Sequence, residues 1–430
     1  MPKYCYKIFN FIFLLDLFGI FKNTPLYLID KFLDIFCAFF CLFYLTYSFF
    51  SKPNEFYSLG RKVIICFLII FGISVIASYL QYKQKITEGM AAQIDCLQVF
   101  ILAFYAYAFN ARKLKIESFE RYIKYFIILN IIILVLFKDY VNKETSLTGS
   151  HALTFKSNYL PMQFIRFGVI YFFVMFLKRG KYIYGIISVG LLFFPNILVH
   201  FERGYFAYNV MVMILTIMMI RKSQKFFSKF IIAILVLPIV LIIAISFSGS
   251  FGANIIAKYG DIISGVTQGT SGDRSVNYRL QEVPAALKLL KKDPLFGSGK
   301  LNSANSILVT GIDLYPSDIG VIGILGAYGF VGLIVFIVIF YYAIKTFRRT
   351  IRNNRRYSVM TMALGIYFMG ICVNAIQTAE VMLTPAFWSF IYMLYLYSKK
   401  LDDEYYQQKL AEWNLLNVEE AADTSQVLLA

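Results

Sequence analysis

The chain of 430 residues contains only two histidines and six cysteines, and this scarcity excludes several kinds of site. His151 and His200 are far apart, and there is no Cys-x-x-Cys pattern, so a zinc site is not expected. All the cysteines lie in or beside apolar stretches, where thiols serve as small packing residues rather than as a disulfide framework. We therefore expect no metal or other cofactor.

Apolar residues dominate the chain, and they are grouped in runs long enough to cross a membrane. Hydrophobic residues make up 59% of the sequence, and about 20 consecutive apolar residues span a bilayer as a helix. The sequence therefore predicts an all-α, polytopic integral membrane protein with about twelve transmembrane helices. The expected spans are 7–21, 32–50, 62–80, 94–110, 122–137, 157–176, 182–200, 204–220, 229–247, 318–343, 357–377 and 384–398.

The formal net charge of +17 follows from membrane topology rather than from nucleic-acid binding. With the N-terminus in the cytoplasm, basic residues fall in the inside loops and are scarce in the short outside loops, as the positive-inside rule requires. The pattern predicts that both termini are cytoplasmic, that the first helix is retained rather than cleaved as a signal peptide, and that nucleic acid is not a partner. The basic clusters lie at 52–62, 112–121, 178–181, 221–229 and 345–356.

One long polar segment interrupts the helices. Nine helices are expected in residues 1–247, an extracytoplasmic loop in 248–317, three helices in 318–398 and a cytoplasmic tail in 399–430. The two halves of the chain share no internal repeat, which weakens a transporter interpretation because many transporters contain two related halves.

Within the loop, residues 282–292 have the pattern of a short amphipathic helix. Pro284 suits the first turn of such a helix, and Pro294 would end it. Apolar residues such as Val283 and Leu290 share one face, with lysines mostly opposite. This pattern fits a helix that lies on the outer membrane surface, and it fits equally a helix packed on its own bundle.

Arg166 is a charged residue inside an apolar stretch. It lies roughly 13 Å along the expected helix from the outer end at Ser157, at 1.5 Å per residue. A cation at that depth costs several kcal/mol unless it faces a cavity or a partner, so Arg166 is a candidate for substrate binding. The alternatives are snorkelling to the outer interface and a structural pair with an acid such as Asp95.

Three further arginines are expected at the outer face. Arg203 lies in the outer turn Glu202-Arg203-Gly204, where the other short loops avoid cations. Arg274 and Arg279 lie in the long loop, where Asp273 to Arg279 would open a helix. Guanidinium groups bind phosphate oxygens in a bidentate fork, so all three are candidate phosphate ligands. Interfacial anchoring of Arg203 and simple solvation of the loop arginines are the alternatives.

Asp318 is the candidate catalytic residue. It opens the predicted Gly-rich helix 318–343, where it could take the proton of an attacking hydroxyl as a general base. It could equally cap the helix, although the neighbouring Ser317 would also serve as a cap. The glycines of this helix predict close helix packing and nothing more.

Three pieces of the chain, in this order, resemble the family of O-antigen polymerases and O-antigen ligases. Glu202-Arg203-Gly204 is similar to that family's Ser-Arg-Gly, and Arg279 followed by Pro294-Leu-Phe-Gly-Ser-Gly299 is similar to its Arg…Pro-Leu-x-Gly-x-Gly stretch. The polar end of the loop then runs into a Gly-rich helix. The resemblance implies a polytopic fold of the GT-C type, with a glycosyltransferase site outside the membrane.

The third piece departs from the ligases, which usually carry His-Asn where this chain has Ser317-Asp318. Asp318 with Gly329 and Gly332 also resembles the Thr-Asp-Phe…Gly-x-x-Gly segment of the peptidoglycan-polymerising shape and division proteins, where the Asp is the essential acid. The resemblance therefore favours a polymerase over a ligase and implies that Asp318 is the base.

The resemblance implies a location in the bacterial inner membrane and a substrate made of glycan repeat units on undecaprenyl diphosphate. Arg166, Arg203, Arg274 and Arg279 would bind the diphosphate or substrate, and transfer would be metal-independent and inverting. Besides the bilayer and the lipid-linked glycans, a chain-length-regulating membrane protein is an expected partner. The alternatives are an O-antigen ligase and, in another class, a flippase or other transporter of lipid-linked oligosaccharides.

Overall fold

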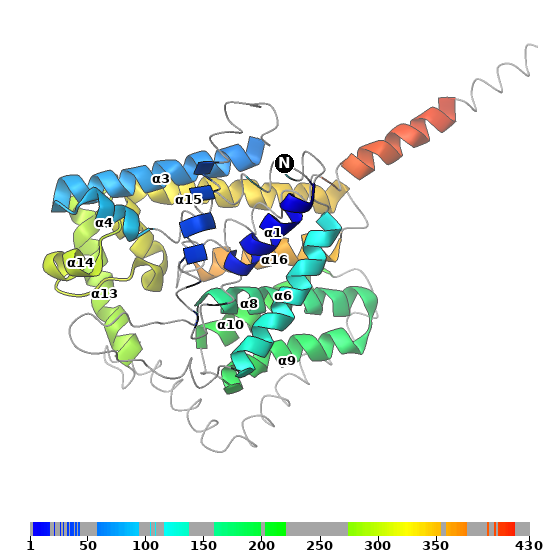
Figure 1. Cartoon of the computed structure of the whole chain (residues 1–430), viewed down its shortest axis with the longest axis horizontal. Helices are drawn as coiled ribbons and strands as arrows, with labels where there is room; N and C mark the ends of the chain where they lie inside the picture. Colours follow the sequence, from blue (N-terminus) through cyan, green and yellow to red (C-terminus); the bar gives the residue numbers. More distant parts are fainter. Residues whose placement is uncertain are drawn as a thin grey trace, which may run out of the picture.

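The computed structural model describes residues 3–17, 58–93, 116–136, 159–198, 203–220, 274–353, 358–375 and 403–417, with isolated positions between 21 and 43 and at 104, 108, 394 and 400. Within these residues every regular element is a helix, which confirms the all-α class (Figure 1). The predicted span 229–247 lies outside the described residues, and 32–50, 94–110 and 384–398 are represented only by isolated positions. The number of spans therefore stays a prediction.

The helices follow the predicted apolar runs closely at most positions. In the first half of the chain they are α1 (Lys3–Leu17), α3 (Ser58–Tyr82), α4 (Ile86–Ala91), α6 (Ile116–Leu136), α8 (Tyr159–Arg179), α9 (Tyr182–Leu198) and α10 (Arg203–Met219). The second half contains α13 (Arg274–Lys292), α14 (Ser303–Thr310), the 3-10 turn η3 (Pro316–Ile319), α15 (Gly320–Asn353) and α16 (Val359–Asn374).

Two of the described helices are long and apolar enough to cross a membrane. These are Ile65–Tyr82 in α3 and Pro316–Arg349, which includes η3 and most of α15, and several shorter apolar helices accompany them. Large apolar side chains on both helices point outward, among them Ile76 at 59% exposed and Ile334 at 58% exposed. Outward-facing apolar side chains are what a lipid environment requires, so the architecture is compatible with a membrane protein.

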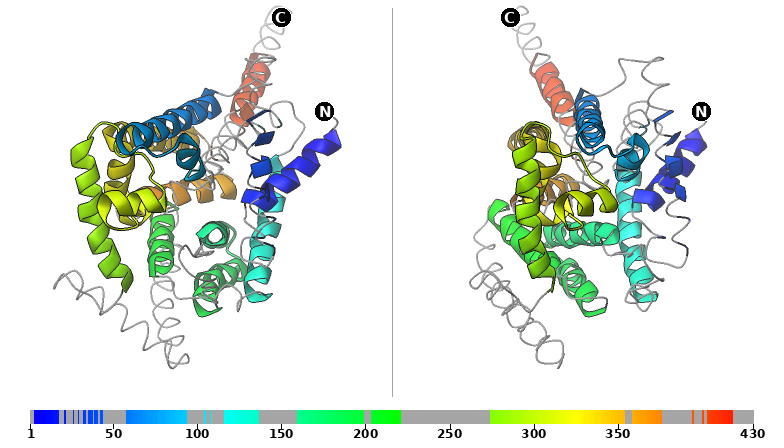
Figure 2. Two further views of the ribbon diagram at one scale, coloured as in Figure 1. Left: turned by 60° about the vertical axis from the view of Figure 1, so that its left-hand side comes forward. Right: turned by 90° about the vertical axis from the view of Figure 1, so that its left-hand side faces the viewer.

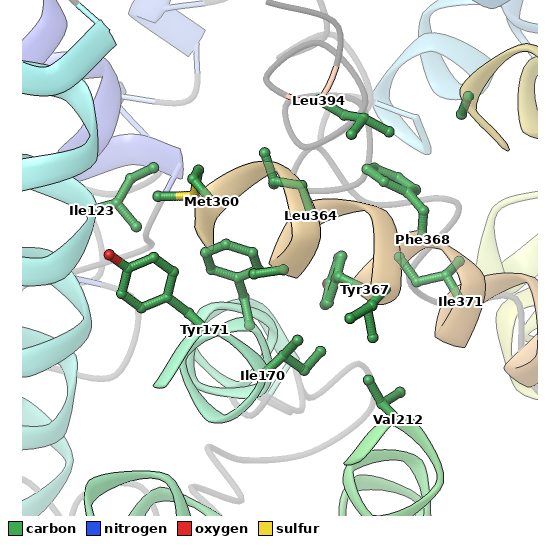
Figure 3. Packing of buried hydrophobic residues seen from close by; sticks show 14 of the residues in the cluster. Ile123, Ile170, Tyr171, Val212, Met360, Leu364, Tyr367, Phe368, Ile371 and Leu394 are labelled. Atoms are coloured by element: carbon green, nitrogen blue, oxygen red, sulfur yellow. The ribbon is translucent and has the colours of Figure 1, made fainter. Parts of the chain in front are cut away.

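The core is centred on α16. Nearly every side chain from Met360 to Phe368 is buried, which is typical of a helix surrounded by other helices. Figure 3 shows Met360 near Ile123 of α6 and Tyr171 of α8, and Ile371 on the side of Val212 of α10. Ser358 caps α16 by accepting a hydrogen bond from the backbone N–H of Thr361.

Contacts along α16 show in which direction the neighbouring helices run. A Cβ on Gly365 would meet the ring of Phe347, near the end of α15, whereas Gly370 lies against Tyr208, near the start of α10. The N-terminal parts of α8, α10 and α15 therefore share one side of the molecule, and the basic ends of α8 and α15 share the other. The predicted assignment of the basic side to the cytoplasm stays a prediction.

The described part of the loop packs across the end at which α15 begins. Figures 1 and 2 show α13 and α14 at that end, with α13 crossing the direction of α15. The apolar face of α13 buries Ala285, Ala286 and Leu289 against Ile319 and neighbouring residues. Ala285, Ala286 and Leu289 therefore form the face that packs on the bundle, with Val283 of the predicted apolar face partly buried beside them; contact with a membrane surface stays a prediction. Residues 248–273 of the predicted loop lie outside the described residues.

Candidate functional site

Arg279 lies on α13, which is longer than predicted. Residues 282–292 are helical and the helix ends at Lys292 as predicted, but the expected start with Pro284 in the first turn is wrong, because α13 begins at Arg274 and Pro284 lies inside it. Pro284 lacks the N–H that a helix interior normally uses, and its side chain is exposed rather than packed in the core. The prediction that Arg274 and Arg279 open a helix is confirmed. Arg279 is exposed, so its guanidinium is accessible to a ligand.

Asp318 does not begin α15, as the sequence suggested. It belongs to the 3-10 turn η3, and α15 begins after it at Gly320, where the backbone has a positive φ of 57°. The Asp318 backbone N–H donates to the Tyr315 carbonyl at 2.9 Å, and the Ser317 hydroxyl donates to the Asp318 carboxylate at 3.3 Å. The carboxylate is partly exposed, as a group that receives a proton from a substrate must be.

A second carboxylate, Asp313, organises the segment that precedes Asp318. Its Oδ2 accepts hydrogen bonds from the Tyr315 hydroxyl at 2.8 Å and from the Ser303 hydroxyl, and its backbone carbonyl accepts one from the Tyr278 hydroxyl of α13. Partial burial raises the pKa of the Tyr278 phenol, and the Asp313 charge adds to the shift. Burial and the hydrogen bond to Asp313 raise the pKa of Tyr315 in the same way. Both phenols therefore remain protonated donors at neutral pH.

The motif Pro294-Leu-Phe-Gly-Ser-Gly299 forms a turn that docks into a kink of α15. The backbone N–H groups of Phe330 and Val331 donate to the carbonyls of Pro294 and Leu295, at 2.9 and 3.1 Å. In return, the Ser298 N–H donates to the Gly326 carbonyl at 2.9 Å. The turn thus satisfies backbone groups that the kink releases from the helix. This part of the motif holds the loop on α15, and these hydrogen bonds give it a structural role.

The other side of the same turn is held by polar side chains from α3 and the residues that follow it. Ser74 Oγ accepts from the Lys300 N–H at 2.8 Å, and Gln84 Oε1 accepts from the Asn302 N–H at 2.8 Å. Gln81 donates to Asp293 and to the Gly297 carbonyl. The loop is therefore fixed to the two long apolar helices α3 and α15, and so provides a base for α13 and η3.

Arg166 lies in the interior of the helix bundle. Its side chain is 4% exposed, and its guanidinium carbon lies 5.7 Å from the ring centre of Tyr208 on α10, within cation–π range. The Tyr208 hydroxyl donates to the Tyr367 carbonyl of α16 at 3.0 Å. A Cβ on Gly370 would approach that hydroxyl to 2.9 Å, so glycine leaves the space that Tyr208 occupies. Burial excludes snorkelling for Arg166, and Asp95 lies outside the described residues.

Two of the predicted residues can be placed by their backbone alone. Arg203 is the first residue of α10, and Arg274 is the first residue of α13; their side chains lie outside the described part. Tyr208 follows Arg203 by little more than one helical turn, roughly 7 Å along the axis. The start of α10 therefore brings Arg203 to the neighbourhood of Arg166, whereas Arg279 and Asp318 are joined through α13 and η3.

Replacing Tyr208 separates the role of its ring from that of its hydroxyl. In Tyr208→Phe the ring still faces Arg166, so we expect near wild-type activity and a loss of about 1 kcal/mol of stability for the missing hydrogen bond. In Tyr208→Ala the ring that faces the Arg166 guanidinium is gone, so Arg166 loses its support and activity should fall. Activity and thermal stability of the purified variants check this. Equal loss of activity in both variants would show that the hydroxyl is what matters.

Several residues of this site escaped the sequence prediction. They are Tyr278, Asp313, Tyr315, the glutamines at the end of α3, and Glu282, whose Oε1 accepts a hydrogen bond from the Tyr315 N–H at 2.9 Å. Each looks like an ordinary loop or helix residue. One usable signal was the spacing of Glu282 from Arg279, which puts both on neighbouring positions of one helix. Several of the other contacts, such as Tyr278 with Asp313 or Gln84 with Asn302, join residues far apart in the sequence, and no local pattern indicates them.

Comparison with known proteins identifies the segment that contains most of these features. Residues 196–337 match the family described as O-antigen ligase, and the match includes the start of α10, all of α13, the docked turn and η3. A comparison with curated proteins gave no match. The match supports a membrane protein of the O-antigen ligase and polymerase type, which are enzymes that resemble glycosyltransferases. The match of residues 196–337 confirms the resemblance to the O-antigen ligase family that the motifs predicted.

Proposed function

We propose that this protein is an O-antigen polymerase, which joins oligosaccharide repeat units carried on undecaprenyl diphosphate at the periplasmic face of the inner membrane. The observation that carries the proposal is the pair of hydrogen bonds between α13 and the segment leading into α15. The Tyr315 N–H donates to Glu282 of α13, and the Tyr278 hydroxyl of α13 donates to the Asp313 carbonyl. These hydrogen bonds tie the helix of Arg279 to the turn of Asp318 at the end of an apolar helix long enough to cross a membrane. The family match of residues 196–337 supports the same class of reaction.

The proposed reaction is a direct displacement at the anomeric carbon of the donor glycan. The hydroxyl of an acceptor repeat unit attacks this carbon, and the bond from the carbon to the diphosphate oxygen breaks. The hydroxyl proton passes to Asp318, and undecaprenyl diphosphate leaves with the electron pair of the broken bond. Attack from the side opposite the leaving group inverts the anomeric centre.

The arginines have the role of stabilising the leaving group in this proposal. Negative charge develops on the diphosphate as it departs, and guanidinium groups offset that charge. Arg279 and Arg274 would approach it from the loop, and Arg203 and Arg166 from the bundle. Because arginines supply the positive charge, the proposed transfer needs no metal ion. Apolar surface between the helices would hold the polyprenyl tail.

A polymerase is preferred over a ligase because the segment before α15 reads Ser317-Asp318, without the histidine usual in ligases. A ligase, which moves a finished glycan to another lipid, is the second candidate, and the family description of residues 196–337 favours it. A flippase of lipid-linked oligosaccharides is the third. A membrane protein that sets chain length is a further proposed partner, and both termini are proposed to be cytoplasmic.

The length distribution of the surface glycan tests the proposal. Cells that lack the gene are complemented with wild type, Asp318→Ala, Arg279→Ala or the control Lys288→Ala, which changes an exposed cation on the same helix. Surface glycan is resolved on a gel after the membrane level of each variant is confirmed. We expect cells without the protein to carry a single repeat unit, and only wild type and Lys288→Ala to restore a ladder.

Two outcomes would contradict parts of this proposal. Cells without the protein that display no repeat unit at all would point to a ligase or a flippase. A full ladder from Asp318→Ala at normal membrane levels would show that another group receives the proton.

A further inference from the structure

Glu282 is a carboxylate on the buried face of α13. Its exposed fraction is 0%, and the residues that follow it on this face, Ala285, Ala286 and Leu289, are apolar. Burial of a carboxylate in such surroundings is costly unless hydrogen bonds compensate. An apolar residue would complete this face at lower cost, so the presence of Glu282 requires a specific reason.

The bond that Glu282 makes leads directly to the candidate base. Its Oε1 accepts a hydrogen bond from the backbone N–H of Tyr315 at 2.9 Å. The carbonyl of the same residue accepts from the backbone N–H of Asp318, also at 2.9 Å. Tyr315 is therefore held by α13 through its N–H, and it holds the turn of Asp318 through its carbonyl.

A second contact makes this attachment rigid. One turn before Glu282, the Tyr278 hydroxyl donates to the Asp313 carbonyl, so α13 grips the extended segment 313–315 at both ends. Arg279 lies between these two gripping residues on the same helix. The place of α13 relative to the turn of Asp318 is thus fixed by two hydrogen bonds rather than by the course of the loop alone.

We propose that Glu282 is a positioning residue for the transfer reaction, because it sets the place of Asp318 relative to Arg279. This inference rests on the proposed function. Glu282 acts as a hydrogen-bond acceptor and transfers no proton, so its charge is not required. Glutamine keeps a side-chain oxygen of the same reach and should replace it, whereas methionine keeps the approximate shape but offers only a weak acceptor.

The test compares three substitutions in the purified full-length protein with a polyprenyl-diphosphate-linked repeat unit as the substrate. We expect Glu282→Met to lower kcat about a hundredfold, since misplacement by 1 Å has effects of this size, with little change in the KM of the donor. Glu282→Gln should keep kcat within about threefold of wild type. The matched control Gln281→Ala, at an exposed neighbouring position of α13, should leave both constants unchanged. Thermal unfolding of each variant is measured alongside.

A second comparison uses Asp318→Ala as the background. If Glu282 acts through Asp318, adding Glu282→Met to that background has little further effect, because residues acting as a unit are not additive. Multiplicative losses overturn the proposal. So does a Glu282→Gln variant as slow as Glu282→Met, which would assign a role to the charge. A Glu282→Met variant that does not accumulate also overturns it, because the residue would then serve folding. If wild type itself transfers no glycan, the proposed function fails instead.

Discussion

Replacing Gly329 with alanine is expected to abolish activity and to release the loop from α15. Gly329 has φ 63° and ψ −168°, a backbone conformation found almost only in glycine. Strain of this kind costs about 1–3 kcal/mol by itself. In addition, a Cβ at this position would lie 2.2 Å from the Leu295 carbonyl oxygen, which is a backbone atom and cannot rotate away. The alanine variant must therefore lose either the kink or the docked turn.

Loss of the kink or of the docked turn should also disturb the candidate site. The N–H groups of the two residues after Gly329 donate to the carbonyls of Pro294 and Leu295. Gly297 on the turn also has no room for a side chain, because its Cβ would lie 2.6 Å from the Gly329 nitrogen. When the turn leaves, α13 loses its attachment at its C-terminal end. Arg279 and Asp318 then no longer share a fixed geometry, and activity should fall by more than about a hundredfold.

The measurement compares Gly329→Ala with Gly190→Ala. Gly190 lies inside α9 with nothing within 4 Å of its Cβ position, so alanine there should be neutral or slightly stabilising. Activity and thermal unfolding are recorded for both, and Gly329→Ala should unfold roughly 5 °C below wild type. Wild-type activity in Gly329→Ala would mean that the kink is not needed to place the site.

The kink also illustrates what the sequence could and could not predict. Long apolar runs dictate helices because each backbone polar group in a membrane must bond within its own segment, so the positions of α3, α8 and α15 were predictable. The glycines of α15 predicted close packing but not the bend at Gly329, since the groups that satisfy the bend come from Pro294 and Leu295. Hydrogen bonds between segments distant in the sequence have no local signature.

The candidate site likewise contains features that the sequence could predict and features that it could not. The position of Arg166 in an apolar run predicted a substrate-binding cation or a snorkelling one, and its burial excludes snorkelling while substrate binding stays a prediction. Its partner from α10, Tyr208, could not be inferred, because an aromatic residue in a membrane helix is usually a packing residue. Asp318 was expected to open α15, yet the positive φ of Gly320 separates it into a turn of its own. A single glycine gives no warning of such a break.

Replacing Arg166 should have the second large effect. Arg166 is the most deeply buried of the candidate arginines whose side chains are described, and only a strong requirement justifies a cation at that depth. If it binds the diphosphate, Arg166→Met removes the guanidinium but retains much of the volume of the side chain. Transfer should fall about a hundredfold or more, in the range found when a preorganised donor to a developing anion is removed.

Lysine distinguishes charge from geometry at this position. Arg166→Lys retains a positive charge but not the planar fork that contacts two phosphate oxygens together and stacks on an aromatic ring. We expect Arg166→Lys to have intermediate activity and to bind the donor more weakly than wild type. The control is Arg179→Ala, which removes an exposed arginine from the other end of α8 and should leave transfer unchanged.

A structural role for Arg166 predicts a different set of results. A guanidinium that only packs on the Tyr208 ring would stabilise α8 against α10, so Arg166→Met would lower the unfolding temperature while the surviving folded protein transferred glycan at the wild-type rate. A diphosphate ligand gives a different pattern, because the substrate loses its counter-charge and the folded protein transfers glycan more slowly. Measuring unfolding and transfer on the same preparation separates the two roles, since only the loss of a diphosphate ligand slows transfer by the protein that remains folded.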